Sequence, residues 1–235
     1  MPRRPRAATG GMFFHVLNRA VGRERLFRKE ADYAAFLRII DEVQQRLPAR
    51  LLVYCLMPNH WHLVLWPAGD GELSEFMRLL TVTHTQRWHA HHHSAGTGPL
   101  YQGRFKSFPI ERDEHLLAVC RYVERNALRA KLADRAERWR WGSLWQRTNP
   151  GPVEGMPSLM SWEDCPVQRP AQWTEWVNRP QSTAEEAAIA ESIRRGRPYG
   201  DAAWQRRTAA KLGLQSSLRP RGRPRVRPIK DSRPL

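Results

Sequence analysis

The chain has 235 residues, and its 39 lysines and arginines against 23 aspartates and glutamates give a formal net charge of +16 at pH 7. This length allows one large domain, or one domain with an appendage. The charge favours a polyanionic partner, with nucleic acid preferred to an anionic membrane surface. Three widely spaced cysteines argue against a disulfide framework or a cysteine zinc site. With no run near the roughly 18 apolar residues of a membrane span, we expect a cytoplasmic, nucleoid-associated protein.

Hydrophobic periodicity predicts strands alternating with helices. In chain order we predict a strand over 12–18, a helix over 29–47, strands over 51–57 and 60–66, a helix over 73–89, a strand over 104–110 and a helix over 113–128. This β-α-β-β-α-β order followed by a helix predicts an α+β protein with a ferredoxin-like split-βαβ fold. Such a fold has an antiparallel sheet with helices packed on one face.

The composition changes after Arg147 to proline, glycine and polar residues. We therefore predict one folded domain over 1–148 and a basic C-terminal extension over 149–235. The extension contains two candidate helices, over 184–194 and 201–212. Its last part is rich in arginine and proline, which cannot bury a core, so we expect disorder until it binds an anion.

The segment "CLMPNHWHLVLW" places two histidines in an otherwise apolar strand. Side chains at i and i+2 of a strand share a face, so His60 and His62 project together while Trp61 points the other way. Two imidazoles at this spacing can chelate one divalent metal ion. The alternative, two structural histidines with hydrogen-bond partners, stays equally open on this pattern alone.

A third ligand and a nucleophile are available in "RYVERNALRA", where Tyr122 and Asn126 lie one helical turn apart. If that face meets the sheet, the Asn126 oxygen completes a metal site and the Tyr122 phenol lies beside a scissile phosphate. Tyr101, in "GPLYQGRFKSF", is the rival nucleophile because basic residues follow it. Tyr122 is preferred because only this tyrosine has a ligand-type residue one turn away.

Four segments, "CLMPNHWHLVLWP", "GPLYQGRFKSFPI", "RYVERNALRA" and "RGRPYGDAAW", together resemble the REP-associated tyrosine transposases. These are relatives of the single-tyrosine transposases in the HUH endonuclease superfamily, and the resemblance spans about residues 12–225. It implies that His60 and His62 are the metal-binding pair and that Tyr122 is the catalytic tyrosine. Asn126 falls at the position of a polar third ligand.

The resemblance also implies an activity, which is metal-dependent cleavage and rejoining of single-stranded DNA at repetitive extragenic palindromic hairpins. The expected cofactor is Mg²⁺ or Mn²⁺. Attack by Tyr122 would leave a 5′-phosphotyrosine and a free 3′-OH, and attack by another strand's 3′-OH would rejoin the DNA. Family members are usually single chromosomal genes, which favours cell housekeeping over self-transposition. We expect a monomer or a homodimer that binds single-stranded or hairpin DNA and no membrane.

Seven basic residues are candidate DNA contacts. They are Arg104 and Lys106 on the predicted strand, Arg121 and Arg125 beside Tyr122, and Arg221, Arg223 and Arg225 in the tail. For the first four the alternative is a solvated surface. The tail segment "RGRPR" resembles an AT-hook core that lies in a narrow minor groove, and a disordered solubilising tail is its alternative. The histidine cluster over 89–93 is assigned to a loop, where any metal binding would be adventitious.

Two other functions remain open. The basic tail also suits a non-catalytic hairpin DNA-binding protein that keeps the HUH fold only as architecture. An HUH replication-initiator nuclease is disfavoured, because such proteins generally carry helicase or origin-binding modules for which this chain has no room.

Overall fold

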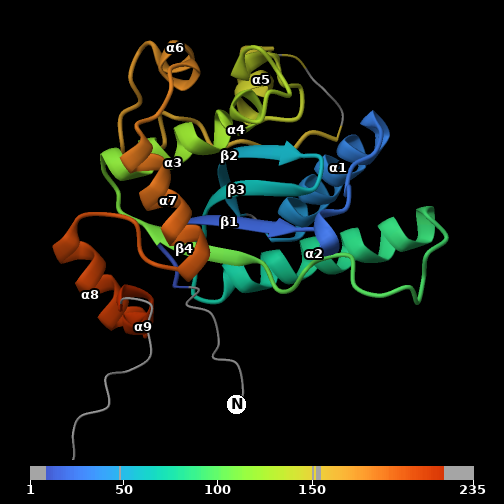
Figure 1. Cartoon of the computed structure of the whole chain (residues 1–235), viewed down its shortest axis with the longest axis horizontal. Helices are drawn as coiled ribbons and strands as arrows, with labels where there is room; N and C mark the ends of the chain where they lie inside the picture. Colours follow the sequence, from blue (N-terminus) through green and yellow to red (C-terminus); the bar gives the residue numbers. More distant parts are fainter. Residues whose placement is uncertain (1–8, 48, 150, 152–154, 220–235) are drawn as a thin grey trace, which may run out of the picture.

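The computed structural model describes residues 9–47, 49–149, 151 and 155–219. At its centre is an antiparallel sheet in the order β2-β3-β1-β4 (Figure 1). Its strands are β1 (Phe13–Arg19), β2 (Arg50–Met57), β3 (His60–Trp66) and β4 (Lys106–Ile110). This order is that of a ferredoxin-like split-βαβ sheet, so the predicted α+β fold class is confirmed.

The helices follow the predicted order. They are η1 (Val21–Arg23), α1 (Glu30–Arg46), α2 (Glu72–His91), α3 (Glu114–Glu124), α4 (Asn126–Arg129), η2 (Ala136–Arg138), α5 (Ser143–Thr148), α6 (Trp173–Asn178), α7 (Thr183–Arg195), α8 (Ala202–Leu212) and α9 (Gln215–Leu218). Two expectations need correction. The helix over 113–128 is divided at Arg125, and α2 runs to His91, so the histidine cluster is partly helical rather than a loop.

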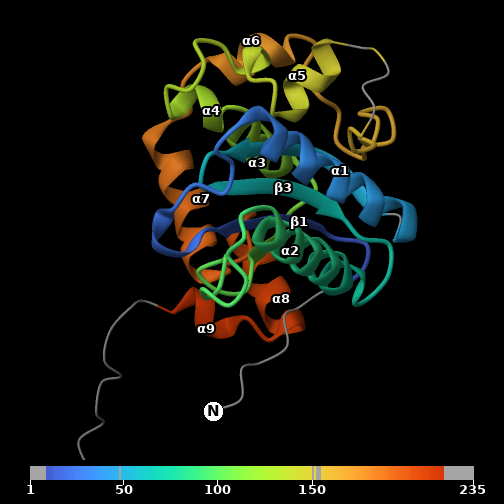
Figure 2. The ribbon, with the colours of Figure 1, turned by 90° about the vertical axis from the view of Figure 1, so that its right-hand side faces the viewer.

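Alternation along the strands separates two hydrophobic layers. From β3, Trp61 and Leu63 pack with Phe36 of α1 and Phe76 of α2, whereas Val64 packs on the side of α3. Figure 2 shows α1 and α2 on one side of the sheet. The helix α3 packs in the other layer, so helices cover both faces of the sheet rather than the one face expected. The helix α3 begins where its sequence predicts, because Asp113 caps it by accepting a hydrogen bond from the backbone N–H of His115.

The C-terminal segment covers the second face of the sheet together with α3. Trp173, Val177, Ile189 and Tyr199 are buried in the same hydrophobic layer as α3. Single β-bridges join the segment to both edge strands, Leu51 to Leu159 and Ile110 to Tyr199. The segment over 155–219 thus shares its core with the sheet, and the division at residue 149 stays a prediction.

Two charged residues of α3 attach the C-terminal segment. The Glu124 carboxylate is buried and accepts hydrogen bonds from Ser143 Oγ and Trp173 Nε1, both at 2.6 Å. Burial raises the pKa of this carboxyl group. Arg121 is only 6% exposed, and its Nη2 donates to the carbonyl oxygens of Arg179, at 2.8 Å, and Pro180, at 3.0 Å.

The DNA contacts at Arg121 and Arg125 stay predictions, because both side chains already have partners within the protein. The Arg121 guanidinium also stacks over the Trp176 ring, 4.4 Å from its centroid, and Arg125 Nη1 reaches the Asn178 carbonyl oxygen at 3.4 Å. Both side chains are therefore occupied by the segment that precedes α7. The sequence could not show this, because their partners lie more than fifty residues away.

A buried histidine ties α2 to the sheet on the other face. His84 is 4% exposed, and its Nδ1 lies 2.6 Å from the Tyr101 hydroxyl, which accepts a hydrogen bond from Trp61 Nε1. Burial lowers the pKa of His84 to about 3. None of the helices in the described ranges is long and apolar enough to cross a membrane.

We predict that acid destabilises the protein through its buried histidines. Between pH 6.5 and about 3 the unfolded chain binds a proton at His84 that the folded chain does not. The free energy of unfolding should therefore fall with decreasing pH over this window, by up to ~1.4 kcal/mol per pH unit for each such histidine. In His84→Gln the free energy of unfolding should depend less steeply on pH, because the uptake of one proton on unfolding is lost. Urea unfolding from pH 7 to 4 measures this slope. Equal slopes would contradict the prediction.

We predict that Arg121→Ala lowers the free energy of unfolding by about 2 to 3 kcal/mol, because two carbonyl groups lose a charged donor and Trp176 loses its stacked cation. The matched control is Arg104→Ala. Arg104 is exposed, so its removal should change stability by less than about 0.5 kcal/mol. Denaturant unfolding of both variants measures the difference. If Arg121→Ala lost no more stability than the control, the prediction would be wrong and a DNA contact by Arg121 would be favoured.

Candidate active site

The histidine pair lies on the sheet face covered by α3. His60 and His62 occupy alternate positions of β3, and their ring centroids are 5.0 Å apart with the planes nearly perpendicular. Trp61, between them, is fully buried in the opposite layer. The two imidazoles are thus adjacent on one surface, as the strand alternation predicts.

A histidine from the neighbouring strand fixes the orientation of His62. His62 is 3% exposed, and its Nδ1 lies 2.8 Å from Nε2 of His15, a fully buried residue of β1. In the tautomer where His62 Nδ1–H donates to His15, the lone pair of His62 Nε2 is free. That Nε2 is buried and has no hydrogen-bond partner among the described residues. An unpaired buried nitrogen costs about 1–3 kcal/mol, which a bound cation would offset.

Both members of the pair are neutral at physiological pH. Burial lowers the pKa of His62 well below its usual range, and the nearby charges of His60, His15 and Arg129 act in the same direction. Burial, followed by the charges of Arg19 and Arg129, lowers the pKa of His60 to about 4. Neutral imidazole is the form that binds metal ions.

Tyr122 of α3 faces this pair. Its ring lies 5.9 Å from that of His62 and is nearly perpendicular to it. The phenol oxygen accepts a hydrogen bond from Arg129 Nη2 at 3.2 Å. Burial raises the pKa of Tyr122, while the Arg129 charge and its hydrogen bond to the phenol oxygen act against that increase. The hydroxyl therefore has a cationic donor in place to stabilise negative charge on its oxygen.

Asn126 lies beside Tyr122 but is already occupied. Its Oδ1 accepts a hydrogen bond from the same Arg129 Nη2 at 3.1 Å, and its Nδ2 is buried with no partner in the described part of the chain. The cavity wall includes Tyr122 and Arg129 but not Asn126. Asn126 as a third metal ligand therefore stays a prediction, and it requires Arg129 to release or share the oxygen.

The histidines and the tyrosine open onto a cavity of about 330 Å³. Its wall consists of Leu17, Asn18, Arg19, His60, His62, Gln102, Gly103, Arg104, Lys106, Tyr122, Arg129 and, from α7, Ala190 and Ile193. Arg104 and Lys106 thus lie at the site, where the sequence predicts them. Four cations and no carboxylate line the described wall, a composition that suits a phosphate.

Three residues at the site were not expected from the sequence. His15 and Arg19 share a face of β1 by strand alternation, and Arg129 follows Tyr122 and Asn126 at helical spacing. These periodicities can be read from the sequence, but the register at which β1 pairs with β3 cannot. The tail residues Arg221, Arg223 and Arg225 lie outside the described residues.

The rival nucleophile Tyr101 lies on the other side of the sheet. Its hydroxyl bonds to His84 and to Trp61, and its ring belongs to the layer beneath α1 and α2. Burial raises the pKa of this hydroxyl well above its usual value. Tyr101 therefore does not face the histidine pair.

One solved structure supports this fold, and a second, weaker match is reported with it. A REP-associated tyrosine transposase bound to a REP hairpin matches with 17% sequence identity and a TM-score of 0.50, covering 68% of this chain and 99% of that one. A protein described as a candidate transposase from Deinococcus radiodurans R1 is 13% identical with a TM-score of 0.37, covering 56% of this chain and 92% of its own. No curated protein matches the chain.

The sequence itself matches a known family. The model of that family, described as "Transposase IS200 like", matches residues 9–126, which is half of the chain. The matched range begins shortly before β1, includes Tyr122 and ends at Asn126. The chain therefore belongs to the family of IS200-like transposases.

Proposed function

We propose that this chain is a metal-dependent single-stranded DNA endonuclease and strand transferase that acts at REP-type hairpins through a 5′-phosphotyrosine. The family identifies a transposase. The observation that carries the finer proposal is the Tyr122 hydroxyl, which faces two neutral histidines in a cavity lined by cations. A phenol nucleophile, a pair of imidazole ligands and phosphate-binding charges are the parts that such a reaction needs.

The residues present fit a divalent ion. His60 and His62 would hold it, with His62 Nε2 as a buried nitrogen that otherwise lacks a partner among the described residues. Asn126 Oδ1 is the proposed third ligand. Bound Mg²⁺ or Mn²⁺ would polarise a non-bridging oxygen of the scissile phosphate.

The protein's own groups carry the covalent step. The Tyr122 oxygen attacks the phosphorus, the new O–P bond forms, and the bond from phosphorus to the 3′ oxygen breaks. The phenol proton leaves to solvent, and the departing 3′ oxygen takes a proton to become a 3′-OH. Arg129 Nη2 donates to the Tyr122 oxygen, which favours the phenolate. Attack on the phosphotyrosine by another strand's 3′-OH reverses these steps and rejoins DNA.

The cations of the cavity wall would position the strand. Arg19, Arg104 and Lys106 line the cavity with Arg129, and contacts of this kind bind the DNA backbone without reading its sequence. A hairpin substrate is supported by the solved relative, which is bound to a REP hairpin. Minor-groove binding by Arg221, Arg223 and Arg225 remains part of the proposal, as does a monomer or homodimer.

A second function is a non-catalytic hairpin DNA-binding protein. The observation in its favour is that Arg129 occupies the Asn126 oxygen, while burial raises the pKa of Tyr122. A protein kept in this arrangement would retain the cationic cavity without a complete metal site.

We predict that the wild-type protein forms a covalent adduct with a hairpin oligonucleotide that carries single-stranded flanks, in the presence of Mg²⁺ or Mn²⁺. Tyr122→Phe should abolish the adduct, because it removes the attacking oxygen and little volume. The matched control Tyr101→Phe should keep it. Denaturing gel electrophoresis of labelled DNA measures both. Tight hairpin binding by wild type without an adduct in either metal would favour the binding protein, and an adduct that survives Tyr122→Phe would exclude this nucleophile.

We predict that His60→Ala and His62→Ala each abolish cleavage while hairpin affinity, measured without a divalent ion, stays within about threefold, because the DNA contacts come mainly from the cations. His15→Leu, which removes only the partner of His62, should raise the Mn²⁺ concentration needed for half-maximal cleavage by about 10- to 100-fold. Cleavage rates across a metal titration, with fluorescence anisotropy for affinity, separate these effects. Normal cleavage by a histidine variant would rule out that histidine as a ligand.

A further inference from the structure

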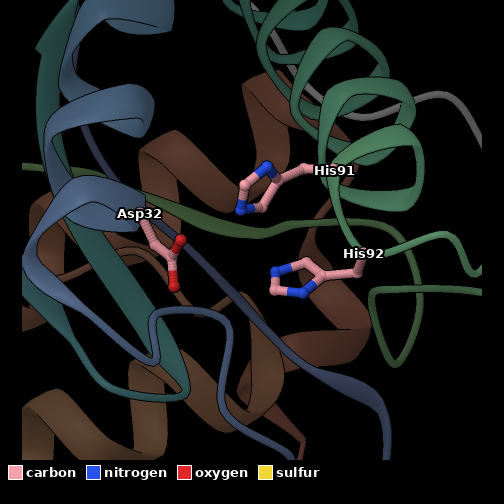
Figure 3. Close-up of side chains that lie close together, drawn as sticks. All are labelled: Asp32, His91 and His92. Atoms are coloured by element: carbon pink, nitrogen blue, oxygen red, sulfur yellow. The ribbon is translucent and has the colours of Figure 1, made fainter.

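A second group of potential metal ligands lies where the start of α1 meets the end of α2. Figure 3 shows Asp32 of α1 facing the rings of His91 and His92. One donor atom from each lies within 4.8 Å of the other two. We propose that these three residues bind a divalent transition-metal ion of the Zn²⁺ type, at a site separate from the His60–His62 pair.

The carboxylate is fixed in place before any ion binds. Asp32 is 9% exposed, and its Oδ2 accepts hydrogen bonds from the backbone N–H groups of Arg28, at 2.8 Å, and Lys29, at 3.1 Å. These two N–H donors hold the carboxylate in one orientation. Oδ1 has no hydrogen bond to any described residue, so it is available as a ligand.

The two imidazoles have free nitrogens. Neither the His91 nor the His92 ring hydrogen-bonds to another residue in the described part of the chain. The His92 ring packs on Trp88, with centroids 4.2 Å apart, and Trp88 is held by a hydrogen bond from its Nε1 to the Leu26 carbonyl oxygen.

Two imidazoles and one carboxylate suit a tetrahedral Zn²⁺ ion whose fourth ligand is water. Bonds of ~2.1 Å place tetrahedral ligand atoms ~3.4 Å apart, so modest rotations of the exposed His91 ring would close the site. Arg28 and Lys29 oppose a dication, so we expect weaker binding than at structural zinc sites with four protein ligands.

A second cluster, formed by Glu111, Asp113 and His115, makes a useful contrast. There Asp113 Oδ1 already accepts from the backbone and the ring of His115, and Glu111 Oε2 accepts from the backbone N–H of Asp201. Its ligand atoms are used within the protein. At the other site, by contrast, Asp32 Oδ1 and the ring nitrogens of His91 and His92 form no hydrogen bond with any described residue.

A bound ion would join two helices that are far apart in the sequence. It would also hold the end of α2, from which the chain continues to Gln102, Gly103 and Arg104 in the cavity wall. The proposal does not depend on the proposed function, because its ligands lie in a different layer of the molecule.

The test uses full-length protein without a histidine tag, in the His60→Ala/His62→Ala background that removes the other histidine pair. Zn²⁺ should bind with a stoichiometry of one per chain by calorimetry. At 100 times its dissociation constant it should raise the unfolding midpoint by at least about 5 °C. Adding His91→Ala and His92→Ala should abolish both effects, and Asp32→Asn should weaken binding at least tenfold.

The matched controls are His89→Ala and His93→Asn, which alter the same histidine-rich segment outside the trio. His89 is engaged with Ser94 Oγ at 2.9 Å, and His93 has a positive φ of 49°, which asparagine tolerates. Both controls should bind Zn²⁺ as the background protein does. The proposal is overturned if the background protein shows no binding, if binding survives loss of His91 and His92, or if the controls lose it equally. Unfolding midpoints without metal show that each variant folds.

Discussion

The side-chain alternation of β3 is the constraint on which the rest of the structure depends. Trp61 is fully buried between the sheet and α1, where its ring meets Phe36 and its Nε1 donates to Tyr101. That burial fixes the strand's register, and the register places His60 and His62 on the other face. A slip of one residue would move both histidines into the apolar layer and the indole into the cavity. Core packing and site geometry therefore have one cause.

On the second face of the sheet, α3 packs against the strands and brings Tyr122 opposite the two histidines. Tyr122 lies between two buried anchors, Arg121 and Glu124, whose partners all belong to later parts of the chain. Because these anchors are hydrogen-bonded to the C-terminal segment, the position of the phenol depends on residues far beyond it. α7 completes the arrangement by contributing Ala190 and Ile193 to the cavity wall. The segment over 155–219 is thus part of the support of the site.

Periodicity was sufficient for the elements but not for their contacts. The strand over 60–66 and the helix containing Tyr122 were predicted because apolar spacing is a local property. His15 was not, since a lone histidine in an apolar strand acquires its meaning only when β1 pairs with β3. Arg121 was predicted to contact DNA because its charge is visible in the sequence, whereas the carbonyl groups that bury it are not. Local pattern identifies elements and candidate residues; long-range pairing decides which candidates meet.

The charges at the cavity couple the binding of its two expected ligands, a divalent metal ion and a DNA phosphate. The described wall has Arg19, Arg104, Lys106 and Arg129 but no carboxylate, and the donors proposed for the metal are neutral. A dication entering alone would meet uncompensated positive charge, which acts after burial to lower the pKa values of His60 and His62. A DNA phosphate supplies the missing negative charge. Under the proposed function, metal and DNA therefore bind with positive coupling, and each raises the affinity for the other by the same factor.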